Sequence, residues 1–293
     1  MNKLISAKKR RAKVILTVIA VILVVSFLGM SYFIGTQVFS GSTQLVTNEE
    51  TRGVSDSFWE KYGMDYTDFS NTYKVEKLEI ASSYGKHTIP ADYIYSVESQ
   101  NSKDYKTVIL VHGLGSNRYS NYPLAEYFLK EGYNVITYDQ RSTNENTARY
   151  TTFGYLEKYD LIDWVNYVEE QAPGQIIGVW GASFGGATAG LALGYEDMDE
   201  KIDFMILDCP VSSMEWMVEQ EMRGMEIGIP ISYMTWCGNI ANKINLGFSY
   251  KDADVAKAMK DFQASSDVTF SCFSVLVLYP YVNRKFPTLS RYS

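Results

Sequence analysis

One short stretch of the chain places a serine where it could act as a nucleophile. The sequence VWGASFGG, from Val179, puts Ser183 in a Gly-x-Ser-x-Gly pattern between an apolar strand-like run and small residues that open a helix. Gly181 and Gly185 allow a sharp strand-to-helix turn in which any Cβ would collide with a neighbouring element. Such a turn exposes the serine hydroxyl, and the following helix N-terminus points at a forming oxyanion. Ser183 is therefore the candidate nucleophile for acyl transfer.

A second stretch, TVILVHGLG from Thr107, predicts another buried strand that runs into His112-Gly113-Leu114-Gly115. A loop of this kind supplies a main-chain N–H to the oxyanion, and the residue after the nucleophile supplies the other. Leu114 and Phe184 are the candidate oxyanion donors. They would act through their main chain, so the identity of their side chains matters little.

Three stretches together resemble the α/β-hydrolase family. They are VILVHGLG from Val108, DQRSTNENTARYTTFGYLEKYDLIDW from Asp139 and VWGASFGG from Val179, and the resemblance extends over about residues 73–260. It is closest to the bacterial, membrane-anchored serine-aminopeptidase-like and acyl-esterase-like branch. The resemblance implies hydrolysis of a small ester, amide or peptide through a Ser183 acyl-enzyme, with neither a metal nor an organic cofactor.

The resemblance also implies a fold class, α/β: a mostly parallel sheet with helices on both faces and a small helical cap. The cap is expected at about residues 212–250, a stretch rich in Met and Trp that would line an apolar pocket or pack on itself. The strand and helix patterns agree with this fold. They predict an antiparallel edge pair at 74–81 and 87–96, strands at 107–111, 134–139, 175–181 and 203–208, and helices at 122–131, 155–171 and 184–195.

The base and the acid of a catalytic triad are missing from their expected places. In this family the chain order is Ser, then Asp or Glu, then His, but the two histidines, His87 and His112, both precede Ser183. We expect His112 to brace its loop and His87 to face solvent. Asp208, at the end of the strand after the nucleophile helix, is a fallback acid.

Three other acidic residues have structural explanations. Asp139 ends a strand and is expected to pair with Arg141. Glu157 and Asp160 lie in the first turn of a predicted helix, where the helix dipole favours negative charge.

Residues 268–293 contain no Asp, Glu, Gly or His, unlike the acidic sequence before them. They could supply one strand at 274–279. Three explanations remain open for this aberrant tail: a frameshifted or truncated gene product, a diverged pseudoenzyme, or a different base. The sequence thus predicts an impaired serine hydrolase, with a non-catalytic α/β-hydrolase-like binding module as the alternative.

The N-terminus predicts a membrane anchor. Six basic residues and no acid precede residue 14, and residues 14–34 carry no charge over a length that spans a bilayer core. The basic flank should stay in the cytoplasm. We therefore expect a cytoplasmic tail at 1–13, a transmembrane helix at 14–35, a stalk with a short helix at 36–72, and an extracellular hydrolase domain at 73–267.

Charge and cysteine content exclude other classes of function. Beyond residue 13 the chain has 21 basic and 34 acidic residues, so it is not expected to bind nucleic acid. Cys209, Cys237 and Cys272 have no metal-ligand spacing, and their odd number argues against a disulfide framework.

Overall fold

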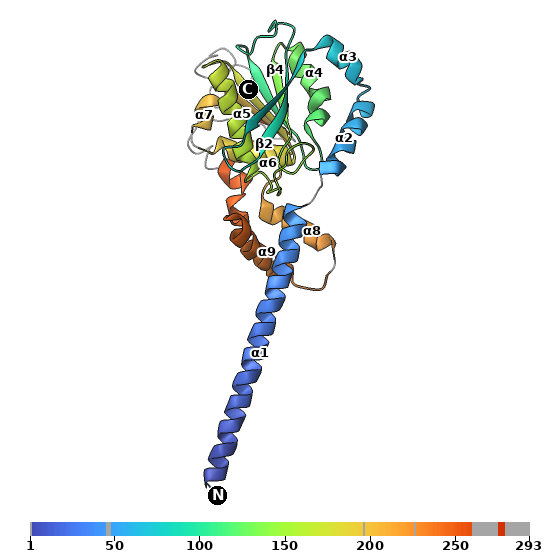
Figure 1. Ribbon diagram of the computed structural model, residues 1–293. Helices are drawn as coiled ribbons and strands as arrows, with labels where there is room; N and C mark the ends of the chain where they lie inside the picture. Colours follow the sequence, from blue (N-terminus) through green and yellow to red (C-terminus); the bar gives the residue numbers. More distant parts are fainter. Residues whose placement is uncertain (1, 45–47, 196, 226, 260–274, 279–293) are drawn as a thin grey trace. The chain divides into compact units, whose positions relative to one another are not determined.

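The computed structural model describes residues 2–44, 48–195, 197–225, 227–259 and 275–278. The chain divides into two compact units. We call residues 1–41 and 218–249 the helical unit and residues 42–217 and 250–293 the sheet unit (Figure 1).

In the part of the chain that the structure describes, the sheet unit has seven strands in the order β1-β2-β4-β3-β5-β6-β7. The four central strands are parallel, whereas β1, β2 and β7 pair antiparallel with their neighbours. The result is a mostly parallel, mixed sheet. The strands are β1 (Val75–Ala81), β2 (Thr88–Ile94), β3 (Thr107–Val111), β4 (Asn134–Tyr138), β5 (Ile177–Ala182), β6 (Phe204–Asp208) and β7 (Val275–Leu278).

Helices flank this sheet (Figure 1). The predicted helices at 122–131, 155–171 and 184–195 are confirmed as α4, α5 and α6, with ends within two residues of the prediction. The described residues of the stretch 36–72 form two helices in addition to the end of α1. The helices of the sheet unit are α2 (Asn48–Lys61), α3 (Tyr66–Thr72), α4 (Tyr122–Lys130), α5 (Glu157–Gln171), α6 (Phe184–Leu193) and α7 (Met198–Lys201).

Side chains of the central strands are buried on both faces of the sheet, which explains their continuous apolar sequence. In β3, Val108 and Leu110 pack in one cluster with Tyr122 and Leu129 of α4. Ile109 points to the opposite face. Helices α5 and α6 contact β3 as well as each other. Strand β3, which leads into the His112–Gly115 turn, is therefore held in the middle of the core.

The edges of the sheet also follow the sequence patterns. The predicted antiparallel pair is confirmed as β1 and β2, paired from Val75↔Ile94 to Ala81↔Thr88. The strand predicted at 274–279 is confirmed as β7, antiparallel to β6. The rest of the tail, 268–274 and 279–293, lies outside the described residues.

The helical unit contains the long helix α1 (Asn2–Thr43) up to residue 41, the end of α8 (Met214–Gly224) and α9 (Ile231–Leu246). Within the described residues, one helix, Arg10–Thr43, is long and apolar enough to cross a membrane. The insert expected at 212–250 is helical. Its second helix packs on α1, where the backbone of Gly35 approaches Cys237 so closely that a Cβ on Gly35 would lie 2.7 Å from the Cys237 carbonyl oxygen.

Candidate active site

Ser183 occupies a strained turn between β5 and α6. Its φ of 52° and ψ of −113° are rarely adopted by a residue with a side chain. Ser183 is exposed, whereas Phe184 directly after it is buried. The main-chain N–H of Ser183 donates to the carbonyl oxygen of Asp208, 2.8 Å away, at the end of the neighbouring strand β6. The turn thus presents the serine hydroxyl outward from a fixed backbone.

The two glycines of the motif are required by close backbone contacts. A Cβ on Gly181 would lie 2.4 Å from the carbonyl oxygen of Gly185. A Cβ on Gly185 would lie 2.2 Å from the carbonyl oxygen of Val111, at the end of β3. The start of α6 is therefore pressed against the end of β3, as the sequence pattern predicts.

The turn that follows β3 passes directly beside Ser183. Val111 is paired with Gly181 in the parallel register of β3 and β5. A Cβ on Gly113 would lie 3.8 Å from the Cβ of Ser183 and 3.7 Å from the carbonyl oxygen of Ala182. The structure therefore brings together the two stretches that the sequence singles out.

His112 is buried beneath this turn and both of its ring nitrogens are engaged. Nδ1–H donates to the carbonyl oxygen of Gly113 at 2.8 Å, and Nε2 accepts from the main-chain N–H of Gln140 at 3.0 Å. Burial lowers the pKa of His112 to about 4, so the ring is neutral at pH 7. The carbonyl oxygen and the next N–H point in opposite directions across a trans peptide. By holding the Gly113 oxygen, His112 directs the N–H of Leu114 away from itself.

Asp208 lies at the end of β6, paired with Ala182 of the nucleophile strand. Cys209, the next residue, is exposed and has a φ of 47°. A hydrogen bond with the Asp208 carboxylate raises the pKa of the Cys209 thiol. The carbonyl oxygen of Asp208 therefore contacts the main chain of Ser183, at the strand end where the sequence offers a fallback acid.

Two expectations for neighbouring residues are wrong. The side chain of His87 is only 7% exposed, and its Nε2 lies 3.0 Å from Asp160 Oδ2, so it does not face solvent. Asp139 pairs with Arg118, whereas Arg141 pairs with Asp160 at 2.9 Å. The local sequence suggested Asp139–Arg141 because they are two residues apart, but tertiary contacts selected more distant partners.

An ionic cluster surrounds the buried Arg118, and the sequence patterns do not predict it. Its guanidinium pairs with Asp92, Asp139 and Glu145, and Tyr122 donates to the same Asp92 oxygen that Arg118 binds. Burial raises the pKa of Asp92 and of Asp139, although the charge of Arg118 acts in the opposite direction. The signal in the sequence was a charged residue, Asp92, inside the strand run HTIPADYIYS.

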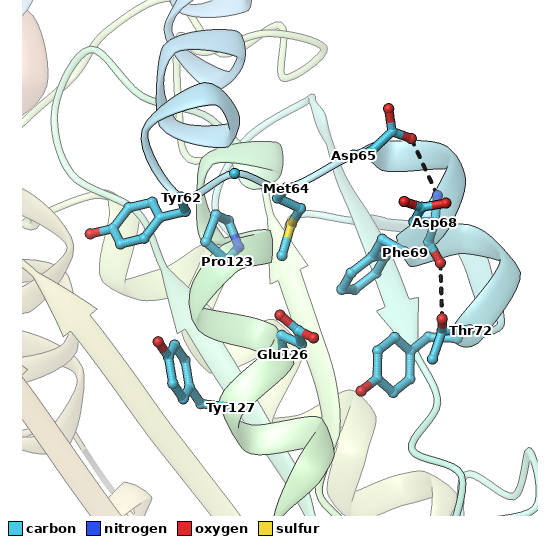
Figure 2. A pocket seen from close by; sticks show the side chains of 11 residues that line it. Tyr62, Met64, Asp65, Asp68, Phe69, Thr72, Pro123, Glu126 and Tyr127 are labelled. Carbon is cyan, nitrogen blue, oxygen red and sulfur yellow. Dashed lines mark hydrogen bonds between the residues drawn. The ribbon is translucent and has the colours of Figure 1, made fainter.

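A hollow of about 240 Å³ lies between α3, α4 and the turn before α3 (Figure 2). Tyr62, Phe69 and Tyr127 are among its aromatic lining residues, and Asp65 and Glu126 are among its acids. Ser183 does not line it, and Asp65 is engaged in capping α3 through the main-chain N–H groups of the helix. The hollow is therefore separate from the proposed nucleophile.

Among the described residues, no group of three or more His, Cys, Asp or Glu side chains is placed to hold a metal ion. Cys237 is a buried free thiol, and Cys272 lies outside the described residues.

Residues 106–228 match the family model of the alpha/beta hydrolase fold. A protein of Bacillus subtilis (strain 168), called Uncharacterized protein YqkD, is 30% identical over 139 residues, which are 46% of this chain and 45% of the relative. The chain thus spans less than half the length of that relative.

Many solved structures are also similar to this chain. The Pyrococcus furiosus esterase Pf2001 is 26% identical, with a TM-score of 0.46 over 60% of this chain and 68% of that one. A Bacteroides ovatus protein, provisionally named dipeptidyl aminopeptidase IV, is 17% identical, with a TM-score of 0.45 over 64% of this chain and 26% of that one. The matched family model and the topology of the sheet support an α/β-hydrolase family for this chain, and its fold is the α/β-hydrolase fold.

Proposed function

We propose that this chain is a membrane-anchored, extracytoplasmic serine hydrolase whose nucleophile is Ser183. The observation that carries the proposal is the exposed Ser183 in its strained turn, next to the His112–Gly115 turn. Its substrates would be small esters, amides or peptides. Membrane attachment is proposed from the length and apolar composition of α1, with the basic N-terminus in the cytoplasm.

The proposed reaction is acyl transfer to water. The Ser183 oxygen adds to the substrate carbonyl carbon while its proton passes to solvent water. The main-chain N–H groups of Leu114 and Phe184 hold the oxyanion. The carbon–leaving-group bond then breaks, the leaving group takes up a proton, and water releases the acid from the acyl-enzyme. His112 would act as a positioning residue, since it binds the carbonyl of the peptide that carries the Leu114 N–H.

We further propose that hydrolysis by this chain is weak. No histidine follows Ser183 in the sequence, His112 has both nitrogens engaged, and His87 is paired with Asp160. Asp208 remains the proposed acid. Loss of the base removes most of the rate and leaves about 10³-fold over water, from the oxyanion hole and substrate binding.

The same observations favour a second candidate function, a non-catalytic binding module that keeps the α/β-hydrolase scaffold. The two candidates differ in whether Ser183 reacts. The test is turnover of a short-chain nitrophenyl ester by the full chain, with Ser183→Ala and, as a matched exposed serine, Ser83→Ala.

A slow rate that Ser183→Ala lowers and Ser83→Ala leaves unchanged would support the impaired hydrolase. A rate that neither variant changes would favour the binding module. A fast, Ser183-dependent rate would show that another group serves as the base, and Asp208 would be the first residue to mutate.

A further inference from the structure

A hollow of about 260 Å³ lies between the turn that joins β1 to β2 and the segment that joins β4 to α5. No acidic residue among those described lines it. Its basic lining residues are Lys86, His87, Arg141 and Arg149, all of them in the sheet unit. We call this the basic hollow.

Two positive charges at the basic hollow have no counter-charge among the described residues. Lys86 and Arg149 are both exposed, and neither forms an ion pair with a described residue. The guanidinium of Arg149 lies over the ring of Tyr150, 5.1 Å from its centre. Arg141, in contrast, is paired with Asp160 at 2.9 Å. The hollow therefore attracts anions, and a charge of −2 would match the two unpaired cations.

Arg141 adds a buried donor to the wall of the basic hollow. Its side chain is only 7% exposed, and its Nη2 donates to Asp160 Oδ1 and to the carbonyl oxygen of Tyr84. Its Nε–H is buried and has no acceptor among the described residues. Buried donors are nearly always paired, because an unpaired one loses its bonds to water without replacement. An oxyanion in the hollow would supply this acceptor.

The two segments that carry the exposed cations are held in place. In the first, the main-chain N–H of Ser83 donates to Asp163 Oδ2 of α5 at 2.8 Å. In the second, the hydroxyl of Ser142 donates to the carbonyl oxygen of Ala148 at 2.7 Å. A site whose backbone is already fixed loses less conformational freedom when a ligand binds.

The basic hollow is also at the edge of the sheet where ligands usually bind. Strand β2 runs antiparallel to β4 with Ala91 opposite Tyr138, so the start of β2 lies beside the carboxyl end of β4. In open α/β sheets, ligands bind beyond the carboxyl ends of the strands. Ser183, which follows β5, is at the same edge but does not line the hollow.

We propose that the basic hollow binds a phosphate group of charge −2, either free phosphate or the phosphate of a small phosphomonoester. Its donors would be the Nε–H of Arg141, the ammonium of Lys86 and the guanidinium of Arg149. Phosphate oxygens accept bonds from several directions, which suits a set of Arg and Lys donors. A carboxylate carries one charge and would leave one of the two cations unpaired. This inference does not depend on the reaction proposed for Ser183.

The test is isothermal titration calorimetry of the full chain in detergent, with inorganic phosphate as the probe at a pH where phosphate is a dianion. The variants are Lys86→Gln and Arg149→Gln, both at exposed positions. The matched control is Lys61→Gln, because Lys61 is an exposed lysine that does not line the basic hollow. Thermal unfolding without phosphate checks that each variant is folded.

We expect one phosphate to bind per chain, and each of the two variants to weaken its binding roughly fivefold, with no change in Lys61→Gln. Acetate at equal ionic strength should bind more weakly than phosphate. Glycerol phosphate that binds more tightly than phosphate would identify a phosphomonoester as the ligand, and weaker binding would identify free phosphate. Absence of saturable binding, binding that both variants leave unchanged, or acetate binding as tight as that of phosphate would overturn the inference.

Discussion

The main-chain N–H of Ser183 donates to the carbonyl oxygen of Asp208 over 2.8 Å, which ties the turn after β5 to the end of β6. Ser183 has a φ of 52°, and a backbone held in such a region costs about 1–3 kcal/mol. Bonds to the neighbouring strand and tight glycine contacts on the other side hold that conformation. The arrangement keeps the hydroxyl exposed while its backbone cannot relax.

The contact of Gly185 with Val111 predicts a large loss of stability for Gly185→Ala. The new methyl would lie 2.2 Å from a main-chain oxygen, so α6 or β3 must move. Overpacking usually lowers the free energy of unfolding by about 1–3 kcal/mol. We expect a loss of at least the upper end here, because neither the new Cβ nor the Val111 carbonyl can move without its main chain. Urea unfolding of the full chain in detergent, followed by tryptophan fluorescence, measures the effect.

The control for that variant is Gly53→Ala. Gly53 is inside α2, and its added methyl would meet nothing within 4 Å. This substitution should be neutral or stabilise by up to about 1 kcal/mol. Equal effects of the two substitutions would contradict the tight packing of the turn.

Because His112 is buried in its neutral form, we expect the folded chain to lose stability in mild acid. Its pKa is about 4 in the folded chain against 6.5 ordinarily, so below pH 6.5 the unfolded chain binds a proton that the folded chain does not. The stability that the neutral His112 ring contributes is therefore fully present above pH 6.5 and declines as the pH falls to about 4. This difference in pKa corresponds to a loss of roughly 3 kcal/mol in the free energy of unfolding.

The measurement compares the unfolding free energy of the chain with that of His112→Gln between pH 7.5 and pH 4.5. The variant lacks the titrating ring, so the difference between the two should shrink as the pH falls. A difference that stays constant across this range would show that His112 is not buried in its neutral form.

The ionic cluster predicts a strong effect for Arg118→Met. Removal of the guanidinium leaves Asp92 and Asp139 buried without their cation, and breaking a buried pair costs about 3–5 kcal/mol. The loss should grow as the pH rises from 5 to 8, because the pKa of an unpaired buried carboxyl exceeds its value in the unfolded chain. Lys130→Met, which removes an exposed pair with Glu126, should change stability by less than about 1 kcal/mol.

The sequence predicted the backbone of the site better than its polar contacts. Ser183, Gly113 and Gly185 could be placed because a strand followed by a small-residue turn has few conformations, and the order of strands in this fold then brings the two turns together. The contacts of Asp92, Arg118 and His87 could not be predicted, because their partners are 21 to 73 residues away and their side chains meet only after the sheet and helices pack. The extension of α1 to Thr43 could not be predicted either, because residues 36–43, although helical, are mostly polar and lie beyond the apolar run.

Anchoring by α1 predicts that the sheet unit stays with the membrane fraction and is released by protease added to intact cells. The apolar run of α1 is long enough to span a bilayer core, and the basic residues before it oppose translocation. Immunoblotting of fractionated cells, with and without protease, measures both properties. A full-size soluble product in the medium would contradict the anchor.

The central claim is that Ser183 is the reacting serine of an α/β-hydrolase site. The most direct measurement is reaction of the full chain with a fluorophosphonate, followed by mass-spectrometric mapping of the adduct in the folded chain, the urea-unfolded chain, Ser183→Ala and Ser83→Ala. We predict a slowly formed adduct on Ser183 that survives in Ser83→Ala and disappears on unfolding and in Ser183→Ala. An adduct on another residue, or none above the unfolded level, would contradict the claim.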